Sequence, residues 1–120
     1  MNFPDLETCK AIAGEFLESE FIYVMRTRNR LCTFPVVIKT GERVVGDDLV
    51  ANAPTCEELG EWLYNKGKIT GCYVVREGDD RFSVYSVVSY RLLFNPSIKA
   101  PNETQARAEA VKLILEQKNA

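Results

Sequence analysis

Hydrophobic residues in this chain are spaced with the period of a helix in some segments and with the pattern of a strand in others. Residues 6–17 carry hydrophobic side chains three and four positions apart, and residues 55–65 and 102–117 do the same. A repeat near 3.6 residues is typical of a helix that buries one face. The sequence therefore predicts three amphipathic helices.

Each predicted helix begins at a residue that suits its start. Asp5 can cap the first helix, and Asn102 can cap the third. Thr55, with Glu58 three positions later, forms a capping box before the second. This second helix carries the single tryptophan, Trp62, whose burial would contribute more than that of any other side chain. We expect it to be the centre of the core, with Trp62 packed against the strands that follow.

Between the helices, the pattern changes to β-branched and aromatic residues separated by polar turns. Strands are predicted at residues 21–25, 31–39, 69–77 and 81–94, and a short one at 44–45.

Pro35 lies inside the predicted strand 31–39. Proline cannot donate a ladder hydrogen bond, so this strand should be an edge strand or contain a bulge. Residues 46–54 are expected to form a loop that leads into the second helix.

The resulting order is α-β-β-(β)-α-β-β-α over residues 1–120, without a repeat or a linker. Hairpins with short turns favour an antiparallel sheet, with helices packed on it. The expected fold is a single α+β domain with an antiparallel sheet of four to five strands and three helices. Three hydrophobic stripes need more area than one face of such a sheet offers. Either helices cover both faces, or part of this surface lies in a homodimer contact, and we leave dimerisation open.

Composition narrows the range of functions. Hydrophobic residues make up 46% and charged residues 27% of the chain, as in ordinary globular proteins. The net charge of −2 gives no overall attraction to nucleic acid or to an anionic membrane. No hydrophobic run approaches the ~20 residues that span a bilayer, and the N-terminus lacks the features of a signal peptide. We expect a cytoplasmic protein that does not contact membranes.

The chain contains no histidine and four widely spaced cysteines: Cys9, Cys32, Cys56 and Cys72. The absence of histidine removes Ser-His and Cys-His nucleophile activation and most catalytic zinc arrangements. Because no two cysteines form a C-x-x-C pair, we expect reduced and mostly buried thiols. No cofactor and no metal site is predicted.

Two stretches of the sequence are similar to a known group of proteins. Ala53-Pro54-Thr55 with Glu58-Leu59 and Trp62-Leu63, followed by a C-terminal helix with Glu103-Thr104 and Ala106-Arg107-Ala108, resembles small uncharacterised proteins of gut-bacterial phages and prophages. Leu6-Glu7-Thr8-Cys9-Lys10 is similar to the way in which such proteins begin. The resemblance implies a phage-derived origin and an α+β fold. It implies no activity and no site residues.

The first class of function is a non-catalytic binding or interaction module. Residues 1–20 carry five acidic side chains against one lysine, whereas residues 26–43 carry five basic side chains against one glutamate. Arg26, Arg28 and Arg30 would lie near a hairpin tip, where they could contact phosphate or carboxylate groups of a host or phage protein or of another anionic macromolecule. The simpler interpretation, which we favour, is that these arginines only guard an edge strand.

The second class is a small enzyme or a metal-dependent activity that uses the turn carboxylates of Asp47, Asp48, Asp79 and Asp80. Paired carboxylates can hold magnesium or act as acid and base. Each pair is adjacent within a turn, where aspartate is favoured for local hydrogen bonding alone. No phosphate-binding glycine loop or nucleophile motif supports them, so this is the less favoured alternative.

Overall fold

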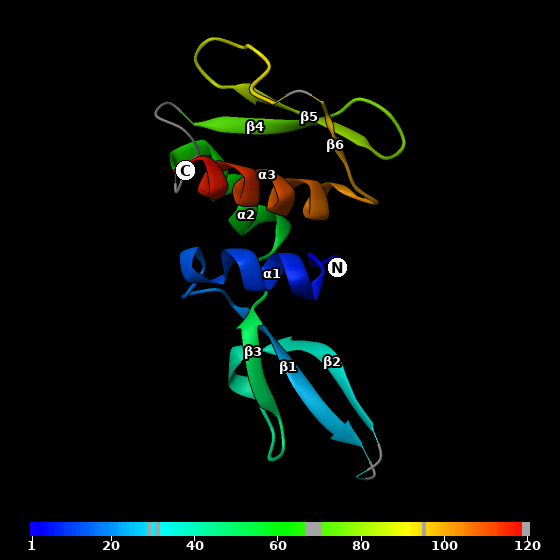
Figure 1. The fold of residues 1–120 in the computed structure, drawn as a ribbon. Helices are drawn as coiled ribbons and strands as arrows, with labels where there is room; N and C mark the ends of the chain where they lie inside the picture. Colours follow the sequence, from blue (N-terminus) through cyan, green and yellow to red (C-terminus); the bar gives the residue numbers. More distant parts are fainter. Residues whose placement is uncertain (29, 31, 67–70, 95, 119–120) are drawn as a thin grey trace.

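The computed structural model describes residues 1–28, 30, 32–66, 71–94 and 96–118. In this part of the chain, three helices lie between two three-stranded antiparallel sheets (Figure 1). The elements are α1 (Leu6–Ile12), β1 (Phe21–Arg28), β2 (Cys32–Lys39), β3 (Asp48–Asn52), α2 (Cys56–Lys66), β4 (Cys72–Arg76), β5 (Arg81–Ser86), β6 (Ile98–Lys99) and α3 (Glu103–Lys118). Short 3-10 turns lie at Ala13–Glu15 and Thr40–Glu42.

The strand orders are β2-β1-β3 in the first sheet and β4-β5-β6 in the second. The two sheets lie at opposite ends of an elongated molecule of 53 × 28 × 27 Å (Figure 1). The helix α1 packs on β3 and on α3, and α2 and α3 pack on each other and on the second sheet. The α+β class, the three helices and the antiparallel pairing are therefore confirmed. The strands divide between two sheets instead of forming the one sheet of four to five strands that was expected.

The predicted helix starts are confirmed. The Thr55 N–H donates to Glu58 Oε1 at 2.9 Å, and the Glu58 N–H donates to Thr55 Oγ1 at 3.2 Å, which is a complete capping box. The Asp5 carboxylate accepts from the Thr8 N–H at 2.8 Å at the start of α1. Both devices satisfy backbone donors that have no partner inside a helix.

The main hydrophobic core lies between α2, α3 and the second sheet. Trp62 is only 5% exposed and lies 6.3 Å from Phe16, measured between ring centroids. It belongs to the same buried cluster as Cys72 and Val74 of β4 and Phe82 of β5. The predicted burial of Trp62 in the core is confirmed, with Phe16 as its ring neighbour, and its direct contact with the strands stays a prediction. A smaller cluster, built on Cys9, Ala51 and Ala53, lies between α1 and the first sheet.

A buried polar network joins α1 to α3. Gln105 of α3 accepts from the Asp5 N–H at 2.7 Å through its Oε1. Its Nε2 donates to Thr8 Oγ1 and to Glu109 Oε1, both at 2.9 Å. Because α1 packs on the first sheet, this network ties that end of the molecule to the larger core.

Several predicted boundaries were wrong. The first helix ends at Ile12, and Leu17, which was assigned to its hydrophobic face, is 76% exposed. Residues 46–54 were expected to be a loop, but Asp48–Asn52 is the strand β3, and no strand lies at 44–45.

The long strand predicted at residues 81–94 was also wrong. It ends at Ser86, and the chain turns at Tyr90 with a left-handed φ of 56°. Only a single bridge, Tyr85 to Leu92, continues the pairing. The strand expected at 69–77 is observed over Cys72–Arg76, and residues 69 and 70 lie outside the described residues.

Candidate functional site

The hairpin β1–β2 carries the three arginines that the sequence singled out. Its two strands pair without interruption from Phe21 opposite Lys39 to Arg28 opposite Cys32. The hairpin extends away from the helices and forms one end of the molecule (Figure 1). Alternation along β1 puts Arg26 and Arg28 on the same face, and Arg30 lies in the turn with a φ of 58°. Asn29 and Leu31, the other residues of this turn, lie outside the described residues.

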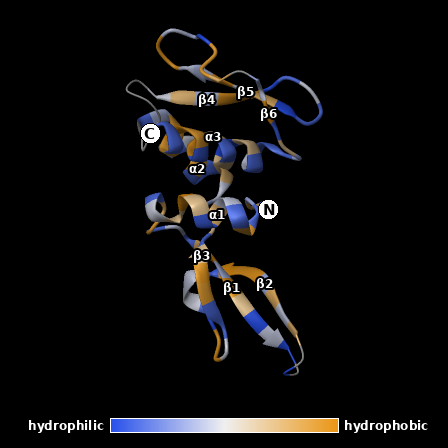
Figure 2. Ribbon diagram, in the orientation of Figure 1, coloured by the Kyte–Doolittle hydropathy of each residue, from blue (hydrophilic) through white to orange (hydrophobic). Residues whose placement is uncertain are grey.

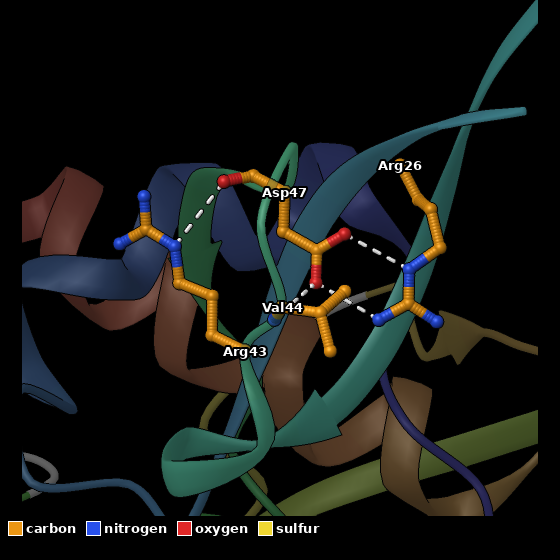
Figure 3. A network of polar contacts seen from close by, with 4 residues as sticks. All are labelled: Arg26, Arg43, Val44 and Asp47. Atoms are coloured by element: carbon orange, nitrogen blue, oxygen red, sulfur yellow. Dashed lines mark hydrogen bonds and ion pairs between the residues drawn. The ribbon is translucent and has the colours of Figure 1, made fainter.

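Arg26 is held by an internal carboxylate. Its Nε donates to Asp47 Oδ1 at 2.9 Å and its Nη2 donates to Asp47 Oδ2 at 2.8 Å, a bidentate ion pair (Figure 3). The Asp47 side chain is 1% exposed and that of Arg26 is 33% exposed. A bidentate arginine–carboxylate pair fixes orientation as well as charge. The guanidinium of Arg26 is thus directed at Asp47, while Arg28 and Arg30 form no ion pair with another described residue.

Asp47 also organises its own turn. Its Oδ2 accepts from the Val44 N–H at 3.1 Å, and its backbone oxygen accepts from Arg43 Nε at 3.2 Å (Figure 3). The hydrogen bonds from Arg26, helped by the Val44 N–H and by the charges of Arg26 and Arg43, lower the pKa of the Asp47 carboxyl from 3.8 to about 2, against the opposing effect of burial. The same hydrogen bonds raise the pKa of Arg26. Asp47 stays ionised near neutral pH, so it has no proton to donate there, and its low pKa makes it a weak base.

The topology explains why this ion pair is where it is. Because β1 is the middle strand of β2-β1-β3, the chain must cross β1 on its way from β2 to β3. Residues 40–47 make that crossing, and Asp47 at their end meets Arg26 on β1. The pair therefore pins the crossing segment to the central strand. Sequence reasoning missed this contact because its members are 21 residues apart, although a turn role for Asp47 was foreseen.

The other candidate carboxylates are dispersed. Asp48 is exposed on β3, opposite Met25 of β1. Asp79 and Asp80 are exposed in the turn between β4 and β5, where Asp80 Oδ2 lies 3.8 Å from Lys99 Nζ. Among the described residues, no three His, Cys, Asp or Glu side chains are grouped in a way that could hold a metal ion. The structure therefore brings together Asp47 and Arg26, but not the four aspartates.

The cysteines differ in their surroundings. Cys9 and Cys72 are buried, Cys56 is half-buried and Cys32 is exposed at the start of β2. Burial, and to a smaller extent the charge of Asp5, raises the pKa of the Cys9 thiol to about 12. Cys9 is thus an inert packing residue, because the thiolate is the reactive form.

An acidic groove lies away from the hairpin. It has a volume of about 550 Å³ and runs between residues 14–19 and the exposed side of α2. Glu15, Glu18 and Glu61 are exposed along it, and Phe16 and Trp62 contribute to its floor. None of the described residues that line it is basic. Opposite charges therefore occupy separate parts of the surface, with the arginines on the hairpin and the carboxylates on this groove.

Comparisons with family models, with curated proteins and with solved structures found no match. In the described part of the chain, no helix has both the length and the hydrophobicity to cross a membrane.

Proposed function

We propose that this protein is a non-catalytic binding module that contacts an anionic partner through the far end of the β1–β2 hairpin. The observation that carries the proposal is the difference between Arg26 and the two arginines beyond it. Arg26 is neutralised by Asp47, whereas Arg28 and Arg30 are exposed on an extended hairpin without an ion pair to another described residue. Arginine presents a planar set of donors that suits carboxylate and phosphate groups.

The shape of the region supports this role. The Arg26–Asp47 pair fixes the crossing segment on the central strand, so that the hairpin is a preorganised support for the two arginines beyond it. Hydrophilic colour gathers at the far end of β1, while much of β2 and β3 is hydrophobic (Figure 2). The acidic groove would repel the same partner, which would orient it toward the hairpin.

The partner in this proposal is a host or phage protein, or another anionic macromolecule, met in the cytoplasm. The resemblance of the helical segments to phage and prophage proteins belongs to the same proposal. Catalysis by turn carboxylates has less support, because Asp47 is held by Arg26 and the exposed aspartates are dispersed.

Binding to an immobilised polyanion tests the proposal. The double variant Arg28→Ser/Arg30→Ser should elute from heparin at lower salt than the parent, because exposed charges act through screened electrostatics. Arg26 is left unchanged, since its loss would release the crossing segment.

The matched control is Arg81→Ser/Arg91→Ser, which removes two exposed arginines, one at the start of β5 and one in the connection after it. It should elute close to the parent. If both pairs lower the elution salt equally, binding follows net charge alone and the hairpin has no special role.

A further inference from the structure

The strand β2 is an edge of the first sheet with little to block it. Within the described residues, only β1 pairs with it, and it lies on the outer side of the sheet (Figure 1). It is eight residues long, and its half-buried side chains are all hydrophobic: Phe34, Val36, Val37 and Ile38. Native edge strands are normally shortened, charged or covered, because an open edge invites another strand. Here Pro35 and Lys39 are the strand's own protecting residues.

The ladder fixes which backbone groups of β2 point outward. The Thr40 N–H donates to Glu20 O at 3.0 Å, so the position after β2 is a hydrogen-bonded pair with the chain before β1. In an antiparallel ladder such pairs alternate with non-bonded ones. Residues 32, 34, 36 and 38 therefore direct their backbone groups to β1, and residues 33, 35, 37 and 39 direct theirs away.

This alternation also accounts for Pro35. It occupies an outward position, where its missing N–H leaves the pairing with Met25 of β1 intact. The open edge then presents the N–H groups of Thr33, Val37 and Lys39, together with the carbonyl groups of all four outward residues. Alternating donors and acceptors of this kind are what a further strand requires.

Charge is distributed unequally along this edge. At the start of β2, Arg28 lies opposite Cys32 in the ladder and Arg30 lies in the turn beside it. At the end of β2, Lys39 Nζ lies 4.0 Å from Glu20 Oε1 and is partly balanced by it. Among the described residues along this edge, positive charge without a nearby carboxylate is therefore found only at the hairpin tip.

We propose that β2 binds an extended peptide as an added antiparallel strand, with acidic residues at the C-terminal end of that peptide. This inference rests on the proposed function and names the chemistry of the partner. β2 runs from the hairpin tip toward the helices, so an antiparallel strand runs toward the tip and brings its C-terminus beside Arg28 and Arg30. Antiparallel pairing is preferred because it is the more stable ladder.

Two other occupants fit the edge less well. A second copy, paired β2 to β2 about a twofold axis, would bring the arginines of each tip beside Lys39 of its partner, where the Glu20 carboxylate already faces Lys39. A nucleic acid could contact the arginines, but it has no backbone amides to pair with Thr33, Val37 and Lys39.

Amide hydrogen exchange with a synthetic peptide tests the proposal on the whole protein. The peptide is as long as β2, alternates valine and threonine, and ends in two glutamates. Its binding should slow the exchange of the Thr33, Val37 and Lys39 amides and leave those of Phe34, Val36 and Ile38 unchanged. Moving the glutamates to the N-terminus should weaken binding about threefold to tenfold, as expected for the loss of exposed ion pairs.

Variants distinguish the contribution of backbone pairing to peptide binding from the contribution of charge. Arg28→Ser/Arg30→Ser should weaken binding by a similar factor while keeping the alternating protection at saturation. Thr33→Pro removes one outward donor at an exposed position and leaves the bonds to β1 in place, so it should weaken binding while the amide spectrum stays native. A peptide with alternate N-methylated residues should not bind.

Three results would overturn the proposal. Salt-dependent peptide binding through Arg28 and Arg30 without alternating protection would exclude strand addition, and it would leave the anion-binding function intact. Protection of Thr33, Val37 and Lys39 that rises with protein concentration in the absence of peptide would assign the edge to a second copy. Absence of binding to both the peptide and heparin would reject the binding function itself.

Discussion

The sheet β4-β5-β6 rests on the two long helices α2 and α3, whereas the sheet β2-β1-β3 rests on the seven-residue helix α1 and on a connecting segment. The first of these contacts buries large side chains such as Trp62, Leu59 and Phe82. The second has, among the described residues, a smaller buried cluster of Cys9, Ala51 and Ala53.

Because stabilisation by hydrophobic burial grows with the area removed from water, the smaller centre contributes less. In the sheet β2-β1-β3, the bidentate ion pair between Arg26 and Asp47 adds to this smaller hydrophobic stabilisation. The two ends of the molecule should therefore respond differently to core truncation, to acid and to salt.

Truncation of Trp62 tests the helix-covered end and should have the largest effect. Trp62→Ala leaves a cavity beside Phe16 in the main core, and we expect a loss of about 3–5 kcal/mol in the free energy of unfolding, measured with denaturant. The matched control is Tyr64→Ala on the same helix, because Tyr64 is 60% exposed. Equal losses in the two variants would show that burial of Trp62 is not what stabilises the helix-covered end.

Loss of the Asp47 charge tests the hairpin end. Asp47→Asn should lower the melting temperature at pH 7, because it removes the charge-assisted pair with Arg26. The pKa of Asp47 is about 2 in the folded protein, against 3.8 for an ordinary aspartate. The stabilisation is therefore fully present only at pH values where Asp47 is ionised in the unfolded chain as well. Its contribution is complete above about pH 5 and is lost as the pH falls toward 2.

The melting temperatures of the parent and of Asp47→Asn should therefore converge in acid. The exposed turn residue Asp79 supplies the control variant Asp79→Asn, which should melt like the parent at every pH. A difference between the parent and Asp47→Asn that persists at pH 2 would mean that the ion pair is not its source.

The connection between the two ends depends on Gln105. Gln105→Ala removes the acceptor of the Asp5 N–H and the donor to Thr8 from a buried site, which should cost about 1–3 kcal/mol. Amide exchange should rise mainly in α1 and the first sheet, since their tie to α3 is weakened. Glu116→Ala, at an exposed position of α3, is the control. Uniform exchange over both sheets would show that the two ends unfold as one unit.

The sequence alone predicted those features that depend on neighbouring residues. The capping box of Thr55 and Glu58 and the cap at Asp5 are local, and both were found where expected. The burial of Trp62 followed from a helical stripe. The edge position of Pro35 followed from its missing N–H, since β2 is an edge strand.

Features that depend on distant residues were not predicted. β3 has a short hydrophobic run, Leu49 to Ala51, flanked by Asp48 and Asn52 and followed by Pro54, so the local pattern predicted a loop, and only its pairing with β1 makes it a strand. Val88, Tyr90 and Leu92 continue the alternation of β5, yet they are exposed because the chain turns after Ser86. The candidate site also depends on a distant residue. Arg26 was grouped with Arg28 and Arg30 because the three are close in sequence, but in the structure Arg26 is paired with Asp47 and the other two are not.

The contact between α2 and α3 offers the smallest effect and the finest test of the helix-covered end. A Cβ atom at Gly60 would lie 2.5 Å from Arg107 Nη1, so Gly60 leaves room for this side chain. Arg107 Nη1 donates to Cys56 O at 2.7 Å, and Nη2 donates to Glu103 Oε1 at 3.0 Å. Alanine in a helix interior is favoured over glycine by about 1 kcal/mol, whereas displacement of Arg107 costs a hydrogen bond worth about 1–3 kcal/mol.

Gly60→Ala in the parent should therefore reduce the free energy of unfolding, by up to about 2 kcal/mol. Arg107→Met keeps an apolar stem and removes the guanidinium, and in that background Gly60→Ala should instead add about 1 kcal/mol of stability. Chemical denaturation of the four members of this cycle measures the change of sign, which isolates the interaction from helix propensity. Equal effects of Gly60→Ala in both backgrounds would mean that the side chain of Arg107 moves aside without cost, and that hydrophobic burial alone joins the two helices at this point.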